Sequence, residues 1–287
     1  MLTAQIILDA MDRAQFAAPA KREILENLSQ GQQIQSEVNA LRLARGDKPM
    51  GFKIGFTNRA LWPLYNVFHP IWAPVWDKTV YQSDARPSVR IADIDMNEIG
   101  KPLSAFSLPR LEPEIVLGLR QAPASSSLED VADSVDWVAH GFEIVQSAFP
   151  DWIFTAAESF AAQSLHAALL VGPRRKVLVH SQLPAFLSAV RLNMSCNGDV
   201  IADGEGTSVL DGPIQALAHL VEMLGRQPPL AAPLVLGAGS IVTTGTLTDA
   251  QPLLPHQHWQ TAIHSAAPPE LAASTLDAPL VDLRLAT

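Results

Sequence analysis

The sequence has only one cysteine, Cys196, among its 287 residues. An internal disulfide is therefore excluded, and a reducing compartment, with the cytoplasm as the default, is the expected location. The sequence also lacks a long hydrophobic run, since stretches such as AALLVG and PLVLGAG are too short to span a bilayer. Asp9 and Asp12 interrupt the apolar segment that a signal peptide would need. No role in a membrane is expected.

Basic residues are few: the chain has 20 lysines and arginines against 29 aspartates and glutamates, which gives a formal net charge of −9. Such a chain repels phosphate backbones, and no run of lysine and arginine offers a local exception. We therefore expect no nucleic-acid partner. With 48% apolar and 17% charged residues, the chain can bury one large core, alone or with a smaller accessory region.

Several well-known catalytic signatures are also absent. The sequence contains no G-x-S-x-G nucleophile elbow, no Walker phosphate-binding loop and no H-E-x-x-H zinc helix. The segment GAGSIVTTGT contains glycines but not the Rossmann spacing.

The N-terminal part of the chain shows helical periodicity. Apolar residues at positions 6, 7, 10, 11 and 14 follow helical spacing, and a second helical pattern runs from about Ser36 to Arg45, with Gly46 as its stop. The next segment, GFKIGFTN, is typical of a short strand. Because side chains alternate along a strand, Lys53 should point away from the apolar set that includes Phe52 and Ile54.

Strand patterns dominate the rest of the sequence, in segments such as LEPEIVLGL, GFEIVQSAF and SIVTTGTLT. Asn197-Gly198 predicts a hairpin, because both central residues of a type I′ turn need positive φ. The residues SSLE at 126–129 predict a capping box for a helix running toward Trp137, and Pro213 suits the first turn of a helix that ends before Gly225. The predicted fold class is therefore mixed, α+β.

Three glutamates form a candidate metal site. Glu112 and Glu114 lie two apart in a predicted strand and so project from the same face. Their repulsion is relieved if a hard divalent cation such as Mg²⁺ or Mn²⁺ lies between them. Glu143 is a third candidate, since a charge inside an apolar strand is costly to bury unpaired. From spacing alone the alternative stays open: a solvated sheet face for the pair and an arginine partner for Glu143.

Three other polar residues carry two interpretations each. Lys53 is either a solvent-facing strand lysine or a reactive group. Asp77, among aromatics and prolines in PIWAPVWDKTV, is either a turn acid or a buried carboxylate with a raised pKa that shuttles a proton. His166 lies in an apolar helical pattern, which is more typical of a satisfied core histidine than of a ligand.

Five segments in order resemble the 2-keto-4-pentenoate hydratase branch of the fumarylacetoacetate hydrolase superfamily. They span roughly residues 51–248 and are GFKIGFTN, LEPEIVLGL, FEIVQSAFPDW, NGDVIADGEGTSVLDGPIQALAHLVEML and SIVTTGTLT. The resemblance implies a rolled, barrel-like mixed β-sheet that carries the metal, in a catalytic domain at 71–287. It also implies an N-terminal helical accessory region at 1–70 and assembly into homo-oligomers.

The resemblance also assigns roles to residues. It implies that the metal, Mg²⁺ or Mn²⁺, is bound by Glu112, Glu114 and Glu143, and that Lys53 and Asp77 are catalytic. Gly245 and Thr246, in the T-G-T segment, should form a loop close to the substrate carboxylate.

Two segments depart from the pattern of this branch. The S-R pair that usually follows the third glutamate is Ser147-Ala148 here, and AAQSL followed by His166 replaces the D-N-A-S run. The missing arginine removes a possible bidentate contact to a carboxylate. His166 offers a substrate-binding donor that the usual hydratases lack. These departures leave the exact substrate open.

The resemblance implies an enzyme acting on a small 2-oxo acid. The expected reaction is metal-dependent addition of water to a 2-hydroxy-2,4-dienoate, which gives a 4-hydroxy-2-oxo acid in the breakdown of aromatic compounds. A carbon–carbon hydrolase of an acylpyruvate, such as maleylpyruvate or fumarylpyruvate, is the second expectation, and a 2-oxo dioate decarboxylase is the third. A non-catalytic partner subunit is less expected, because it would have no use for Lys53 beside three glutamates.

Overall fold

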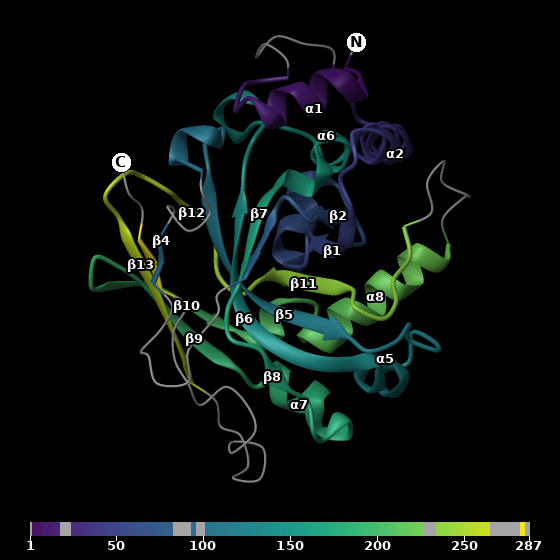
Figure 1. Cartoon of the computed structure of the whole chain (residues 1–287), viewed down its shortest axis with the longest axis vertical. Helices are drawn as coiled ribbons and strands as arrows, with labels where there is room; N and C mark the ends of the chain where they lie inside the picture. The colour runs from purple at the N-terminus through teal and green to yellow at the C-terminus, as the bar shows by residue number, and fades with distance from the viewer. Residues whose placement is uncertain are drawn as a thin grey trace.

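A nine-stranded mixed sheet forms the centre of the computed structural model, which describes residues 2–17, 24–82, 93–95, 101–226, 234–264 and 282–284. Its path runs through seven strands, and two short strands join at its side (Figure 1). In spatial order the path is β2 (Ile71–Trp76), β1 (Pro49–Gly55), β11 (Ile241–Thr246), β5 (Arg110–Leu119), β6 (Val135–Val145), β7 (His166–Val171) and β3 (Val80–Gln82). The short strands are β12 (Gln251–Pro252), which pairs with β5, and β8 (Arg175–Lys176), which pairs with β6.

A second, five-stranded sheet lies beside the first. Its order is β10 (Asp199–Glu205), β9 (Arg191–Cys196), β13 (His258–His264), β14 (Asp282–Arg284) and β4 (Asp93–Asp95). The predicted hairpin at Asn197-Gly198 is confirmed: it joins β9 to β10, and its two central residues have φ values of 54° and 93°.

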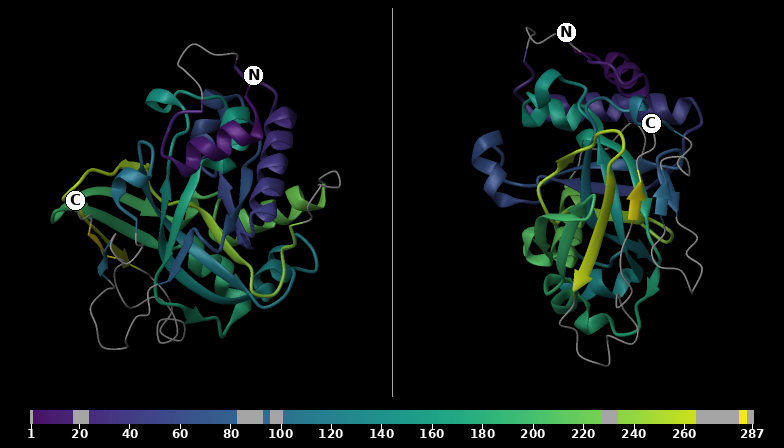
Figure 2. Two further views of the ribbon diagram at one scale, coloured as in Figure 1. Left: turned by 45° about the horizontal axis from the view of Figure 1, so that its top comes forward. Right: turned by 90° about the vertical axis from the view of Figure 1, so that its left-hand side faces the viewer.

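Helices pack at both ends of the main sheet (Figures 1 and 2). One group is α1 (Ala4–Asp12), α2 (Leu28–Ala44) and α6 (Ala156–Ala161), and the other is α5 (Leu128–Ser134), α7 (Leu183–Ser188) and α8 (Pro213–Gly225). The backbones of α2 and α6 approach closely at Gly31, where a Cβ would lie 2.3 Å from the carbonyl oxygen of Ala157. No helix in the described ranges is long and apolar enough to cross a membrane.

Several predicted elements have different bounds. The second helix begins at Leu28 and not near Ser36, because Asn27 caps it by accepting a hydrogen bond from the Ser29 amide at 2.8 Å. The predicted capping residue shifts by one, to Ser127, and the helix ends at Ser134 because β6 begins at the next residue. The helix predicted at Pro213 is confirmed and extends through Gly225.

The expected boundary between accessory region and catalytic domain at residue 70 does not match a break in the fold. β1, which lies before that boundary, is in the interior of the main sheet, paired with β2 on one side and β11 on the other. α1 and α2, which also precede that boundary, lie outside the sheet in a helical layer with α6 (Figure 2).

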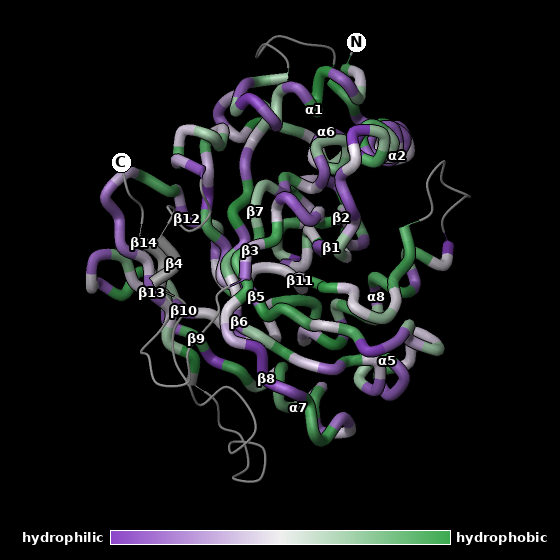
Figure 3. The backbone as a smooth tube through the Cα atoms, in the orientation of Figure 1, coloured by the Kyte–Doolittle hydropathy of each residue, from purple (hydrophilic) through white to green (hydrophobic). Residues whose placement is uncertain are grey.

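The main hydrophobic core fills the space between the curled sheet and α8. Phe52 and Ile54 of β1 pack in one cluster with Phe142 of β6 and Leu217 of α8. Figure 3 shows apolar residues in green on α8 and along the central strands. Because strand side chains alternate, the residues between these apolar positions face the other side of the sheet. The functional groups described below lie on that side.

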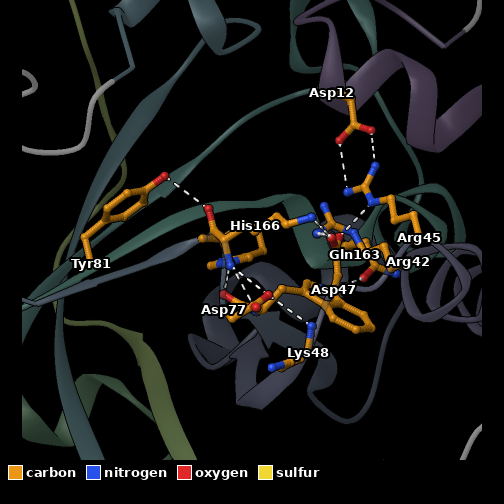
Figure 4. A network of polar contacts seen from close by, with 12 residues as sticks. Asp12, Arg42, Arg45, Asp47, Lys48, Asp77, Tyr81, Gln163 and His166 are labelled. Carbon is orange, nitrogen blue, oxygen red and sulfur yellow. Dashed lines mark hydrogen bonds and ion pairs between the residues drawn. The ribbon is translucent and has the colours of Figure 1, made fainter.

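Asp47 joins α2 to the sheet through buried charge. Its carboxylate forms ion pairs with Arg42 at 3.4 Å, with Arg45 at 2.8 Å and with Lys78 at 2.6 Å, and Arg45 also pairs with Asp12 of α1 (Figure 4). Burial acts to raise the pKa of Asp47, but the hydrogen bonds from Lys78 and Arg45 outweigh it and hold the pKa below its usual value. The network ties the helical layer to the turn between β2 and β3.

We expect Asp47→Asn to lower the free energy of unfolding by about 2–3 kcal/mol at neutral pH, because buried Arg42 would lose its carboxylate partner. Since the pKa of Asp47 is lowered in the folded state, its contribution is present above about pH 4 and fades as the pH falls through the folded-state pKa. Urea unfolding at neutral and acid pH measures both effects. The more exposed Asp12→Asn is the control, with an expected loss under about 1 kcal/mol, and equal losses in both variants would contradict the prediction.

Candidate metal and substrate site

Three glutamate side chains converge on adjacent strands. Glu112 and Glu114 share one face of β5, and the antiparallel register of β5 and β6 places Glu112 directly opposite Glu143. One carboxylate oxygen from each residue lies within 4.8 Å of the others. The structure therefore brings together the three residues predicted as metal ligands. Glu114 and Glu143 are fully buried, and Glu112 is half-buried.

The electrostatics of this cluster are unfavourable without a cation. Burial raises the pKa of Glu112 to about 7, and the negative charge of Glu143 adds to the effect while Lys53 opposes it. Burial, with the charges of Glu143 and Glu112, holds the pKa of Glu114 well above its usual value. Burial acts the same way on Glu143, but Lys53 and His166 outweigh it, so that this pKa is lowered.

Glu114 is held by β11, the neighbour of β5 on the side opposite β6. The Gly245 amide donates to Glu114 Oε2 at 2.8 Å, and the Thr243 hydroxyl donates to the same oxygen. Glu114 Oε1 is buried and has no hydrogen-bond partner among the described residues. Gly245 has a φ of 109°, and a Cβ there would lie 2.1 Å from Thr57 Oγ1. One carboxylate oxygen is thus fixed and the other is left open to a ligand.

Glu143 is fixed by a histidine and a lysine. His166 Nδ1 lies 2.7 Å from Glu143 Oε1, and His166 Nε2 lies 2.8 Å from Thr79 Oγ1. The apolar pattern around His166 predicted a helix, but His166 is the first residue of β7. It is a buried histidine with both ring nitrogens paired, so it orients Glu143, and it is not among the residues that line the cavity described below.

Lys53 is buried on the face of β1 opposite Phe52 and Ile54, as the alternation predicts. Its Nζ lies 3.0 Å from Glu143 Oε2 and donates to the Ser164 carbonyl at 2.9 Å. Burial acts to lower the pKa of Lys53, but the negative charge of Glu143, followed by those of Glu112 and Glu114, outweighs it and raises the pKa. Lys53 is therefore a cation held beside the carboxylates.

The Ser164 carbonyl, which accepts the hydrogen bond from Lys53, belongs to a turn with left-handed backbone conformation. Gln163, Ser164 and Leu165 have φ values of 56°, 49° and 66°, a conformation that costs roughly 1–2 kcal/mol for each residue other than glycine. Such strain is concentrated at functional sites. The Ser164 hydroxyl is buried and has no hydrogen-bond partner in the described part of the chain. Sequence reasoning missed this turn, because none of the three residues is a glycine or an asparagine.

A cavity of about 390 Å³ opens onto this cluster. Its polar lining includes Lys53, Glu112, Ser164 and Thr246, of which Thr246 donates its hydroxyl to the Thr248 carbonyl at 2.7 Å. Aromatic side chains form another part of the lining: Tyr65 lies 4.9 Å from Phe56 and is stacked on Phe154 at 5.7 Å, both measured between ring centroids. The cavity combines a charged end with flat apolar surfaces.

Asp77 is not brought to this cavity. It is exposed in the turn between β2 and β3, where its Oδ1 accepts hydrogen bonds from the Lys48 and Lys78 amides, each at 3.0 Å (Figure 4). Its carboxylate is that of a turn acid, the first of the two interpretations above. Gly245 likewise supports Glu114 and is not among the residues that line the cavity, whereas Thr246 is.

The position of the missing arginine also lies outside the cavity. Ala148 is buried in a separate apolar cluster with Phe149 and with Met11 of α1. An arginine at this position would have to displace α1 or leave its charge buried and unpaired. The small side chain of Ala148 therefore allows α1 to pack at this position, where an arginine would not fit.

Comparison with known proteins identifies the family. Residues 87–271 match the family model described as fumarylacetoacetate (FAA) hydrolase C-terminal, and the chain belongs to this family. It is 29% identical over 219 residues to a 2-hydroxyhexa-2,4-dienoate hydratase of Comamonas testosteroni, covering 75% of this chain and 73% of that protein. It is 28% identical over 226 residues to a 4-oxalocrotonate decarboxylase of a Pseudomonas species, covering 78% of each.

A solved structure shows the same fold. The 4-oxalocrotonate decarboxylase of Pseudomonas putida G7, complexed with magnesium and adipate, superposes with a TM-score of 0.76 at 20% identity and covers 98% of this chain and 95% of that one. The predicted family, the predicted α+β fold with its rolled sheet, and the predicted hydratase-type enzyme are thereby confirmed.

Proposed function

We propose that this protein is a divalent-metal-dependent hydratase that adds water to a 2-hydroxy-2,4-dienoate. The observation that carries the proposal is the convergence of three glutamates and a buried lysine at the charged end of a cavity with aromatic lining. Relatives named as 2-hydroxydienoate and 2-keto-4-pentenoate hydratases support it. The aromatic lining suits a flat, conjugated substrate.

The residues present fit a divalent cation. Three carboxylates supply hard oxygen ligands, which Mg²⁺ and Mn²⁺ prefer. Buried Glu114 Oε1 has no partner in the described residues, and burial and the negative charge of Glu143 raise the pKa values of Glu112 and Glu114. A bound cation would relieve both conditions. We propose Mg²⁺ or Mn²⁺ as the ion, held by Glu112, Glu114 and Glu143.

The chain's own residues would bind, orient and protonate the substrate. When bound, the cation supplies positive charge that stabilises negative charge on the C2 oxygen of a 2-oxo acid. Lys53 holds a proton at Nζ beside this position, where it can be given to carbon and taken back from the enol oxygen. The Ser164 hydroxyl has no hydrogen-bond partner among the described residues and can offer a hydrogen bond to the substrate or to water.

The proposed reaction balances as the addition of one water. The enol O–H proton is lost and C5 gains a proton, which converts the dienol to a 2-oxo-3-enoate. The oxygen of water then bonds to C4 and C3 gains a proton, giving the 4-hydroxy-2-oxo acid. The aromatic lining excludes bulk water from the conjugated chain.

Decarboxylation of a 2-oxo dioate is the second candidate, because one relative that matches 78% of this chain is named as a 4-oxalocrotonate decarboxylase. Cleavage of an acylpyruvate is a weaker alternative. Location in the cytoplasm and assembly into a homo-oligomer stay predictions.

The test is product analysis by mass spectrometry. The protein is incubated with a 2-hydroxydienoate, an acylpyruvate and a 2-oxo dioate, each with Mg²⁺ and with a chelator. We expect the dienoate to gain one water in the presence of Mg²⁺ and not with the chelator. Loss of carbon dioxide or cleavage into two fragments, without hydration, would replace the proposal with the corresponding alternative.

A further inference from the structure

The lining of the cavity contains a second cationic residue besides Lys53. Arg110 lines the cavity and is half-buried at the start of β5. Lys53 already has Glu143 as its partner, whereas the guanidinium of Arg110, although its charge acts on Glu112, forms no ion pair within the described ranges. Asp249 also lines the cavity, but it is exposed and no ion pair joins it to Arg110. An arginine in a cavity without a carboxylate partner is a candidate anion-binding group.

The neighbours of Arg110 hold it in place. Its guanidinium lies over the ring of Trp152, 4.1 Å from the centroid, a cation–π contact. The indole N–H of Trp152 donates to the Leu108 carbonyl at 3.0 Å, which fixes the ring itself. Tyr65 lines the same cavity, and the positive charge of Arg110 acts on its hydroxyl. The guanidinium is thus oriented before a ligand arrives, so less freedom is lost on binding.

The strand sets the position of Arg110 relative to the glutamates. Arg110 and Glu112 are two residues apart on β5 and share a face, so their backbones are roughly 7 Å apart. Arg110 lies on the side of Glu112 away from Glu114. A ligand that engages the glutamate end of the cavity would extend along β5 toward Arg110.

We propose that Arg110 binds a second carboxylate at the far end of the substrate, so that the natural substrate is a dienoate carrying two carboxylates. This inference rests on the proposed function, since the first carboxylate and the 2-oxo group occupy the glutamate end. The planar guanidinium donates two parallel hydrogen bonds to a carboxylate. It supplies the bidentate contact that the absent arginine at position 148 cannot make, because Ala148 faces the helical layer.

The same contact bears on the choice of reaction. An arginine that binds the distal carboxylate stabilises the negative charge that decarboxylation would remove from that group. Hydration leaves this carboxylate ionised and bound throughout. Arg110 therefore favours hydration of a dicarboxylic substrate over its decarboxylation.

The experiment compares two ligands that differ only in the distal group. Isothermal titration calorimetry measures binding of 2-oxoadipate and of 2-oxohexanoate to the full-length protein with Mg²⁺. The wild type is expected to bind 2-oxoadipate about 10- to 100-fold more tightly, the range of a hydrogen-bonded charge pair. Arg110→Gln should bring the two affinities together while leaving that for 2-oxohexanoate unchanged. Arg226→Gln, an exposed arginine at the end of α8, is the control and should keep the preference.

Each result decides the proposal. Arg110→Lys keeps the charge but not the planar fork, so we expect it to retain only part of the preference, and it replaces Arg110→Gln if that variant does not fold. An unchanged preference in the Arg110 variants, or equal weakening of both ligands, would overturn the role of Arg110. Equal binding of both ligands by the wild type would do the same. If the wild type binds neither 2-oxo acid with Mg²⁺, the proposed function itself is overturned, and this inference with it.

Discussion

Glu114→Gln is expected to abolish metal-dependent turnover and to leave a folded protein. The glutamine can still accept the hydrogen bonds of Gly245 and Thr243 through one oxygen, so the packing around β5 and β11 should survive. Its second position would carry an amide NH₂ in place of the unpartnered carboxylate oxygen, and an NH₂ group cannot bind a cation. We expect kcat/KM for the dienoate to fall by about 100- to 1000-fold or more, because charge stabilisation in the transition state is lost.

A thermal unfolding measurement separates metal binding from folding. Metal at about 100 times its Kd should stabilise the wild type by about 2.7 kcal/mol, and Glu114→Gln should show little or none of this gain. Without metal, the Tm of the variant should equal or exceed that of the wild type, since one of three crowded acidic groups is removed. Glu37→Gln, on the exposed side of α2, is the matched control. Full activity of Glu114→Gln with Mg²⁺ would remove the metal assignment.

Lys53→Met is expected to keep metal binding and lose most turnover. Methionine fills the buried space of the lysine stem, but it has no proton to exchange with the substrate. General acid–base catalysis contributes about 100- to 10,000-fold in rate, so we expect kcat to fall by that order. Removing a positive charge next to the carboxylates should leave metal affinity equal or higher.

Two readouts distinguish a catalytic lysine from a structural one. The stabilisation by Mg²⁺ should persist in Lys53→Met, and the affinity for 2-oxohexanoate should change far less than kcat. Lys176→Met, an exposed lysine of β8, serves as the control for loss of a positive charge. Kinetics equal to those of the wild type would exclude Lys53 from the mechanism. Loss of metal binding together with turnover would assign it a structural role instead.

The ligand cluster was predictable because strand alternation is a local property. Glu112 and Glu114 share a face for the same reason that Lys53 opposes Phe52 and Ile54: successive side chains of a strand point to opposite sides. Glu143 was marked by its charge in an apolar segment. The opposition of Glu112 and Glu143, in contrast, depends on the register of β5 and β6. Register is set by burial of whole strands and turn geometry, which no short segment reveals.

Other residues were misplaced by local reasoning. Asp77 matched the resemblance in its place along the chain, but the turn after β2 directs its carboxylate to two backbone amides. His166 follows a helical apolar pattern that extends past the real end of α6. The left-handed turn at 163–165 interrupts that pattern, and it is stable only because its surroundings over-determine it. The sequence did not predict a role for Arg110, because a single arginine in a strand forms no motif. Its place in the lining of a cavity is visible only in the folded structure.

By itself the sequence determined the local elements: the strands with their alternating faces, the hairpin at Asn197-Gly198, the helix after Pro213, and a chain with no possible internal disulfide. Only the tertiary structure decided which polar side chains meet. It placed Lys53 against Glu143, His166 behind it, and Arg110 on Trp152 along the same cavity. The physical reason is the range of the interactions along the chain. Periodicity and turns depend on residues that are close in sequence, whereas the convergence of distant charged side chains depends on burial of the whole core.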